Sequence, residues 1–187
     1  MKPPKFKISR PAAVAMVAAS LCSFLMAQPA PTPTLTPDQP PPDNAGGGGV
    51  SHRDHAFFMK AAKAGNKEVA VSEAVMDRLS TPQLKNFAQT MVTDHTAAGS
   101  ELATLASGKN VQLPPPDPSI ADDWSKKTGD IDNAYIKEMV SDHEDAVRLF
   151  ERGSKSSDPD IAAFAQKTLP TLQHHLMMAQ ELAKTVN

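Results

Sequence analysis

From Ser51 onward, apolar residues recur at spacings of three and four, and glycine and proline become sparse. This spacing is typical of amphipathic α-helices that bury one face against other helices. It predicts four long helices, over residues 53–79, 82–107, 130–152 and 159–185. No alternating strand pattern is present, so the chain is expected to be all-α.

The ends of these helices carry recognisable capping residues. Thr-Pro at 81–82 and Asp-Pro at 158–159 each combine an N-terminal capping residue with proline at the first helical position. Gly108 and Gly153 stand where we expect the C-terminal caps of the second and third long helices.

An internal repeat relates two halves of the helical region. S-T-P-Q-L-K-N-F-A-Q at 80–89 and S-D-P-D-I-A-A-F-A-Q at 157–166 share Ser, Pro, Phe, Ala and Gln. The repeat suggests two helical hairpins, joined by the proline-bearing segment 109–129 with a short helix near 120–127. Two hairpins joined by a long connection predict a ferritin-like four-helix bundle.

The N-terminal segment has the layout of a secretory signal. The first eleven residues carry four basic and no acidic side chains, and an apolar run of sixteen follows at 12–27. This run is short for a membrane-spanning helix, which needs about 20 residues. We predict a signal peptide over 1–27 that is cleaved after Ala27, with retention as an anchor as the alternative. No transmembrane segment is expected in the mature chain.

Residues 28–50 are rich in proline and then in glycine, which predicts a disordered linker before a domain at 51–187. Cys22 is the one cysteine, so the processed chain would have no disulfide. The expected location is the periplasm or cell envelope.

The charge balance excludes nucleic acid as a partner. The chain has 19 basic and 21 acidic residues, and without the first eleven residues the balance is 15 to 21, a net charge of −6. Nucleic-acid binding needs a basic surface. The chain also lacks Gly-x-Ser-x-Gly, a phosphate-binding glycine loop and His-Glu-x-x-His, so we assign no reaction.

Each predicted long helix places one candidate ligand among its apolar positions: Glu68, His95, His143 and His175. Measured from the caps at Thr81 and Asp158, these positions lie 13 to 17 residues along their helices. A spread of four residues is about 6 Å at 1.5 Å per residue. We therefore expect the four side chains to converge at the centre of the bundle.

One carboxylate and three imidazoles suit a divalent metal ion, with Zn, Fe, Mn and Cu all open. The alternative is a structural polar cluster in which Glu68 pairs with a protonated histidine, because an unpaired buried carboxylate is costly.

Several neighbours could support or replace these ligands. Asp94 and Asp142 each precede a histidine and could accept a hydrogen bond from an imidazole of another helix, or lie at the surface. His174 could replace His175 if the last helix is rotated. Three methionines share helix faces with the histidines and suit a soft ion such as copper(I), although they are also ordinary core residues: Met91, Met139 and Met178.

Four short segments carry a resemblance to a known family. They are E-V at 68–69, M-V-T-D-H at 91–95, Y-I-K-E-M-V-S-D-H at 135–143 and L-P-T-L-Q-H-H-L at 169–176. Together they resemble the exported bacterial domain-of-unknown-function family four-one-four-two. The resemblance implies a ferritin-like fold, an envelope location and His175 as the histidine of the last helix. It implies no biochemistry.

The chain departs from di-iron bundles, which use Glu-x-x-His on two helices. The residues three before the histidines are Val92, Val140 and Leu172, so ferroxidase chemistry is not supported. One hypothesis is a metal-binding protein for storage, buffering or sensing. The alternatives are a non-metal interaction or stress-related module, with an envelope partner or a second copy of the chain, and a pH sensor.

Overall fold

The structure is a computed structural model that describes residues 49–186. The predicted signal peptide, and the predicted linker except for Gly49 and Val50, lie outside the described residues. The described part is helical and contains no strand, which confirms the all-α prediction. Its elements are α1 (His52–Val75), the 3₁₀ turn η1 (Met76–Arg78), α2 (Pro82–Gly108), α3 (Pro118–Lys126), α4 (Ile131–Gly153) and α5 (Pro159–Ala183).

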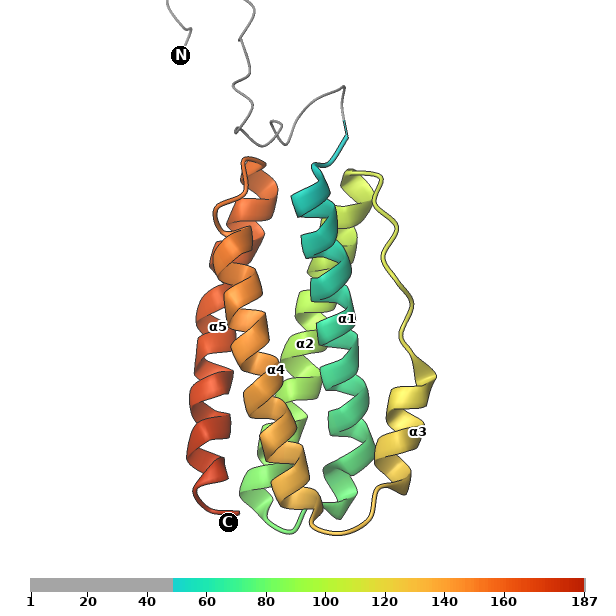
Figure 1. Ribbon diagram of the computed structural model, residues 1–187, viewed down its shortest axis with the longest axis vertical. Coiled ribbons are helices and arrows are strands. Elements are labelled where there is room, and N and C mark those ends of the chain that lie inside the picture. The colour runs from blue at the N-terminus through green and yellow to red at the C-terminus, as the bar shows by residue number, and fades with distance from the viewer. Residues whose placement is uncertain (1–48, 187) are drawn as a thin grey trace, which may run out of the picture. The chain divides into compact units, whose positions relative to one another are not determined.

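The four long helices form two antiparallel hairpins, as predicted. α1 and α2 form the first hairpin and α4 and α5 the second, and the segment between them runs back along α1 through the short α3 (Figure 1). α1 also packs against α4, and α2 packs against α5. Each of the four long helices is therefore antiparallel to the two long helices that it packs against, which is the ferritin-like arrangement with one long connection.

The predicted N-terminal caps are confirmed. Thr81 Oγ1 accepts a hydrogen bond from the backbone N–H of Leu84, and the Asp158 carboxylate accepts from those of Asp160 and Ile161. Each cap satisfies backbone donors that the first turn of a helix leaves free.

The predicted glycine C-caps are wrong. Gly108 and Gly153 are the last residues inside α2 and α4, and the left-handed residue after α2 is Asn110, with φ of 57°. Gly153 is required by packing, since a Cβ there would lie 2.5 Å from the ring of Phe57.

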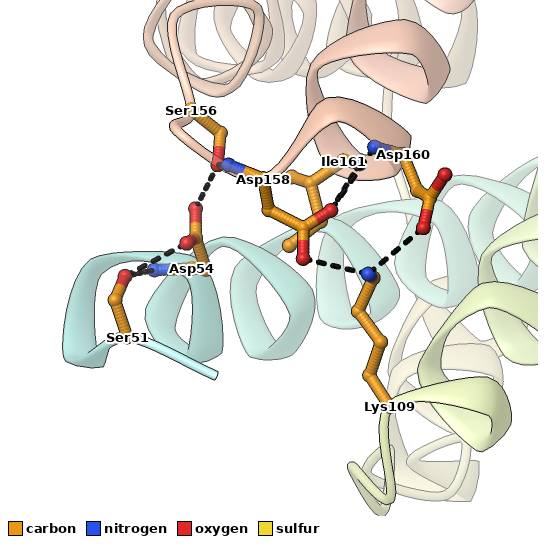
Figure 2. A network of polar contacts seen from close by, with 7 residues as sticks. All are labelled: Ser51, Asp54, Lys109, Ser156, Asp158, Asp160 and Ile161. Atoms are coloured by element: carbon orange, nitrogen blue, oxygen red, sulfur yellow. Dashed lines mark hydrogen bonds and ion pairs between the residues drawn. The ribbon is translucent and has the colours of Figure 1, made fainter. Parts of the chain in front are cut away.

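A polar network joins three chain segments at one end of the bundle (Figure 2). Asp54, in the first turn of α1, accepts hydrogen bonds from Ser51 at 2.8 Å and from Ser156 at 2.6 Å. Lys109, at the end of α2, donates to the α5 cap Asp158 at 2.6 Å. These contacts fix the start of α1, the α4–α5 turn and the end of α2 against one another.

Two apolar clusters fill the bundle. The lower core lies at the end of the bundle that holds the α1–α2 turn, at the bottom of Figure 1. It includes Val71, Val75, Leu84, Met91, Tyr135, Ile136 and Met139. The upper core lies at the opposite end and includes Phe57, Phe58, Ala61, Ala62, Leu102, Ala146, Phe150, Phe164 and Leu172. Within residues 49–186, no helix combines the length and apolar character needed to cross a membrane.

Candidate metal centre

A layer of four polar side chains separates the two cores. We call it the histidine layer: Glu68 from α1, His95 from α2, His143 from α4 and His175 from α5. All are buried, with at most 7% of their surface exposed. On each helix, lower-core residues lie to one side of the polar residue and upper-core residues to the other. The four helices therefore bring these side chains together at mid-height.

The three imidazoles face one another at close range. Their ring centroids are 5.4 to 5.5 Å apart, and one ring nitrogen from each lies within 4.8 Å of the others. Tetrahedral ligands at a metal–nitrogen distance of about 2.05 Å are about 3.4 Å apart. The three histidines could therefore hold a metal ion after a small inward movement of the rings.

Glu68 lies at the edge of this triangle. Its Oε2 is 2.6 Å from His95 Nε2 and 3.8 Å from His143 Nε2. The shorter contact has the distance of an ion pair but lacks hydrogen-bond geometry, and neither Glu68 oxygen has a hydrogen-bond partner. Burial opposes ionisation of this carboxyl, but the neighbouring histidines outweigh it and lower the pKa of Glu68 below its usual value.

His143 is held in one tautomer. Its Nδ1 donates to the backbone carbonyl of Met139, 2.8 Å away. Burial, the largest influence, lowers the pKa of His143, although Glu68 opposes this shift. The ring is therefore neutral near pH 7, and its lone pair is on Nε2, which is buried and has no hydrogen-bond partner.

His175 is held in the opposite tautomer by a different acceptor. Its Nε2 donates to Asp94 Oδ2 at 2.9 Å. Burial lowers the pKa of His175 to about 4. The lone pair is therefore on Nδ1, which is buried without a hydrogen-bond partner. A histidine that ligates a metal almost always donates its other N–H to a carboxylate or a carbonyl, and His143 and His175 both do so.

The remaining candidates lie in different surroundings. Asp94 contacts a histidine, whereas Asp142 accepts a hydrogen bond from Lys67 at 2.8 Å. His174 is exposed, whereas its neighbour His175 is buried in the histidine layer. The three methionines lie in or against the lower core, where Met91 and Met139 are fully buried and Met178 is partly buried: all belong to the layer below the histidines.

The structure adds two residues that the sequence reasoning missed. Ser72 Oγ and Tyr135 Oη form a buried hydrogen bond of 2.9 Å, from positions one turn below Glu68 on α1 and two turns below His143 on α4. Burial, the largest influence, raises the pKa of Tyr135. The four-residue spacing from Glu68 to Ser72 places both on one helix face, and this spacing could have indicated Ser72 from the sequence.

The fold and the layer define a ferritin-like four-helix domain with three converging histidines at its centre. The chain belongs to the family described as "Domain of unknown function (DUF4142)", whose sequence model matches residues 39–182. This match confirms the resemblance seen in the sequence. No curated protein matches the chain at a significant level.

One solved structure supports the fold. The crystal structure of a DUF305 fragment from Deinococcus radiodurans is similar, with a TM-score of 0.63. The similarity covers 73% of this chain and 99% of that chain, at 9% sequence identity. At this identity the likeness concerns the fold alone.

Proposed function

We propose that this domain binds one divalent transition-metal ion in the histidine layer, with His95, His143 and His175 as ligands and Glu68 as the fourth. The role of the domain would be to store, buffer or sense the ion in the periplasm or envelope. The exported location is supported by the basic and apolar pattern of residues 1–27.

The observation that carries the proposal is a pair of buried imidazole nitrogens, His143 Nε2 and His175 Nδ1, that have no hydrogen-bond partner. In His143 and in His175, one nitrogen donates to an acceptor, and the other holds a lone pair with no partner. Leaving buried polar atoms without partners costs free energy, and buried atoms of this kind are rare. A metal ion in the layer would accept these lone pairs together with the Glu68 carboxylate.

The donor set narrows the choice of ion. Three nitrogens and one carboxylate oxygen suit Zn²⁺, and also Cu²⁺ and Fe²⁺, more than the oxygen-loving Mg²⁺ and Ca²⁺. Binding adds two positive charges near Glu68 and Asp94, which are both acidic. The local charge is therefore close to balanced in the loaded protein.

Calorimetric titration of the untagged, chelator-treated domain with Zn²⁺, Cu²⁺, Mn²⁺ and anaerobic Fe²⁺ tests the proposal. We expect one ion per chain, and a large loss of affinity in His143→Ala. Glu68→Gln keeps the shape of the side chain and should weaken binding without unfolding the bundle. His174→Ala removes an exposed neighbour of His175 and is the matched control, which should bind as the wild type does.

A metal-free function is the alternative outcome of the same experiment. If no ion binds, or if His174→Ala weakens binding as much as His143→Ala, the histidine layer is a polar cluster of structural importance. The domain would then be a candidate interaction module. A metal bound at 100 times its dissociation constant adds about 2.7 kcal/mol of stability, so thermal melting provides an independent readout.

A further inference from the structure

A cavity of about 420 Å³ lies on the upper side of the histidine layer. Residues of α1, α2 and α5 form most of its walls, α4 contributes Ala146 and Phe150, and the segment after α2 adds Leu113 and two prolines. Binding sites for small molecules typically have volumes of about 300–1,000 Å³. The cavity is therefore large enough for a small organic ligand.

Two glycines in mid-helix contribute to this space. Gly65 on α1 and Gly99 on α2 both line the cavity, and a Cβ added at either would meet no atom within 4 Å. Neither has a positive φ, so the backbone does not require glycine at these positions. Glycine inside a helix costs about 1 kcal/mol relative to alanine. Gly65 and Gly99 are thus unfavourable for helix formation, and the space that a side chain would take at each stays open beside the cavity.

The far end of the cavity is apolar. Leu102, Phe150 and Phe164 line it, and the two phenylalanine rings have centroids 5.9 Å apart. Seven residues of α1 separate Ala61, in this region, from Glu68 in the histidine layer. At 1.5 Å per residue, the two ends are about 10 Å apart.

The inner end of the cavity carries two acidic residues and two histidines. Glu68 and Asp94 line it together with His95 and His175, and no lysine or arginine does so. Glu68 is 1% exposed. Its Oε2 lies 2.6 Å from His95 Nε2, whereas its Oε1 has no hydrogen-bond partner. A buried carboxylate of this kind is stabilised by a cation that also donates hydrogen bonds.

We propose that this cavity binds a small amphiphilic organic cation, such as an alkyl or arylalkyl amine. The ammonium group donates hydrogen bonds to Glu68, and the apolar body extends toward Leu102 and Phe164. The acidic lining disfavours fatty acids and other organic anions. The site does not depend on a bound metal, but an ion in the histidine layer shares Glu68 and competes with the amine.

Titration calorimetry on the chelator-treated full chain, with octylammonium, octanol and octanoate as probes, tests this proposal. We expect one octylammonium per chain, bound at least about tenfold more tightly than octanoate. From hexyl- to octylammonium, each added methylene should raise the affinity by a factor of about three to four, because burying one methylene contributes about 0.8 kcal/mol. Equal or tighter binding of octanoate would overturn the proposal.

Three variants locate the site. Glu68→Gln should abolish the preference for octylammonium over octanoate, and Gly99→Leu should weaken all three probes by filling the cavity. Gly108→Leu is the control, because Gly108 lies on the same helix, has equally open surroundings and does not line the cavity. Unchanged octylammonium affinity in Gly99→Leu would place the amine elsewhere and overturn the proposal. Metal titrations are separate measurements, so failure of either proposal leaves the other standing.

Discussion

The lower and upper cores are built from the same four helices but are filled differently. Among the described residues, the lower core has two alanines in thirteen buried members, and the upper core has five in twelve. Within residues 49–186, the largest fully buried apolar side chains of the lower core number seven, including Tyr135 and Met91, whereas those of the upper core are Phe58 and Ile161. The upper core contains the 420 Å³ cavity. The core of the bundle is thus more fully packed below the histidine layer than above it.

This difference shows how one helix arrangement can give stability and space together. The helix axes determine how much space lies between the helices, and the volumes of the side chains determine whether that space is filled. The histidine layer lies at the boundary between the packed lower core and the cavity of the upper core.

The largest expected effect comes from the same truncation in each core. Leu84 and Leu102 are almost equally buried, at 1% and 2% exposed. We expect Leu84→Ala to cost about 3–5 kcal/mol and Leu102→Ala about 2–3 kcal/mol, because Leu102 already faces the cavity and loses fewer contacts. Urea unfolding of the two variants measures both values. Equal losses would show that the upper core is packed as tightly as the lower.

Acidification should destabilise the metal-free protein through the buried histidines at the boundary between the cores. Because burial lowers the pKa of His175 to about 4, from about 6.5 in the unfolded chain, the unfolded chain binds more protons between these values. The contribution of His175 to the free energy of unfolding is therefore fully present above pH 6.5. It is lost as the pH falls toward 4, by on the order of 2–3 kcal/mol. The pKa of His143 is shifted in the same direction and adds to the loss.

Chemical denaturation at several pH values between 4 and 7.5 measures this slope. His175→Gln removes the titrating ring, so its stability should change less over the same range. A slope in that variant as steep as in the wild type would assign the acid sensitivity to other groups.

Asp94 and Asp142 offer a matched test of how the layer is supported, since each precedes a histidine on its helix. Asp94 accepts from His175, whereas Asp142 accepts from Lys67. Asp94→Asn should weaken metal binding about 10- to 100-fold, because it removes the carboxylate that fixes the tautomer and orientation of His175. Asp142→Asn should change it far less. Isothermal titration calorimetry of both variants with Zn²⁺ measures the two affinities. Equal losses of affinity would contradict the assigned roles.

The smallest effect is expected at Gly99. The added Cβ meets no atom within 4 Å, so Gly99→Ala should stabilise the protein by about 0.5–1 kcal/mol through helix propensity alone. Thermal and urea unfolding measure the gain. A loss of stability would mean that the open space beside Gly99 is smaller than the structure shows.

Much of the fold could be predicted from the sequence because its signals are local. The spacing of apolar residues gave the four long helices, and the caps at Thr81 and Asp158 marked two of their starts. The cap predicted at Gly153 is wrong because this glycine packs against the ring of Phe57, nearly a hundred residues away in the chain. A local pattern carries no information on such a contact.

The position of the histidine layer was also predictable, because a ligand position on a helix face and its height follow from simple counting. The hydrogen bonds that fix the tautomers of His143 and His175 were not, because they depend on side-chain rotamers and on a neighbouring helix. The cavity was not predicted either. It depends on what small residues of three helices leave unfilled, and no single helix shows this.

An anomalous difference map from crystals of the untagged protein grown with Zn²⁺, recorded at the zinc edge, is the most direct test of the central claim. We expect one strong peak per chain, about 2.0–2.2 Å from ring nitrogens of His95, His143 and His175 and from an oxygen of Glu68. A map with no peak in this layer, or with peaks at exposed histidines such as His52 and His174 alone, would contradict the account.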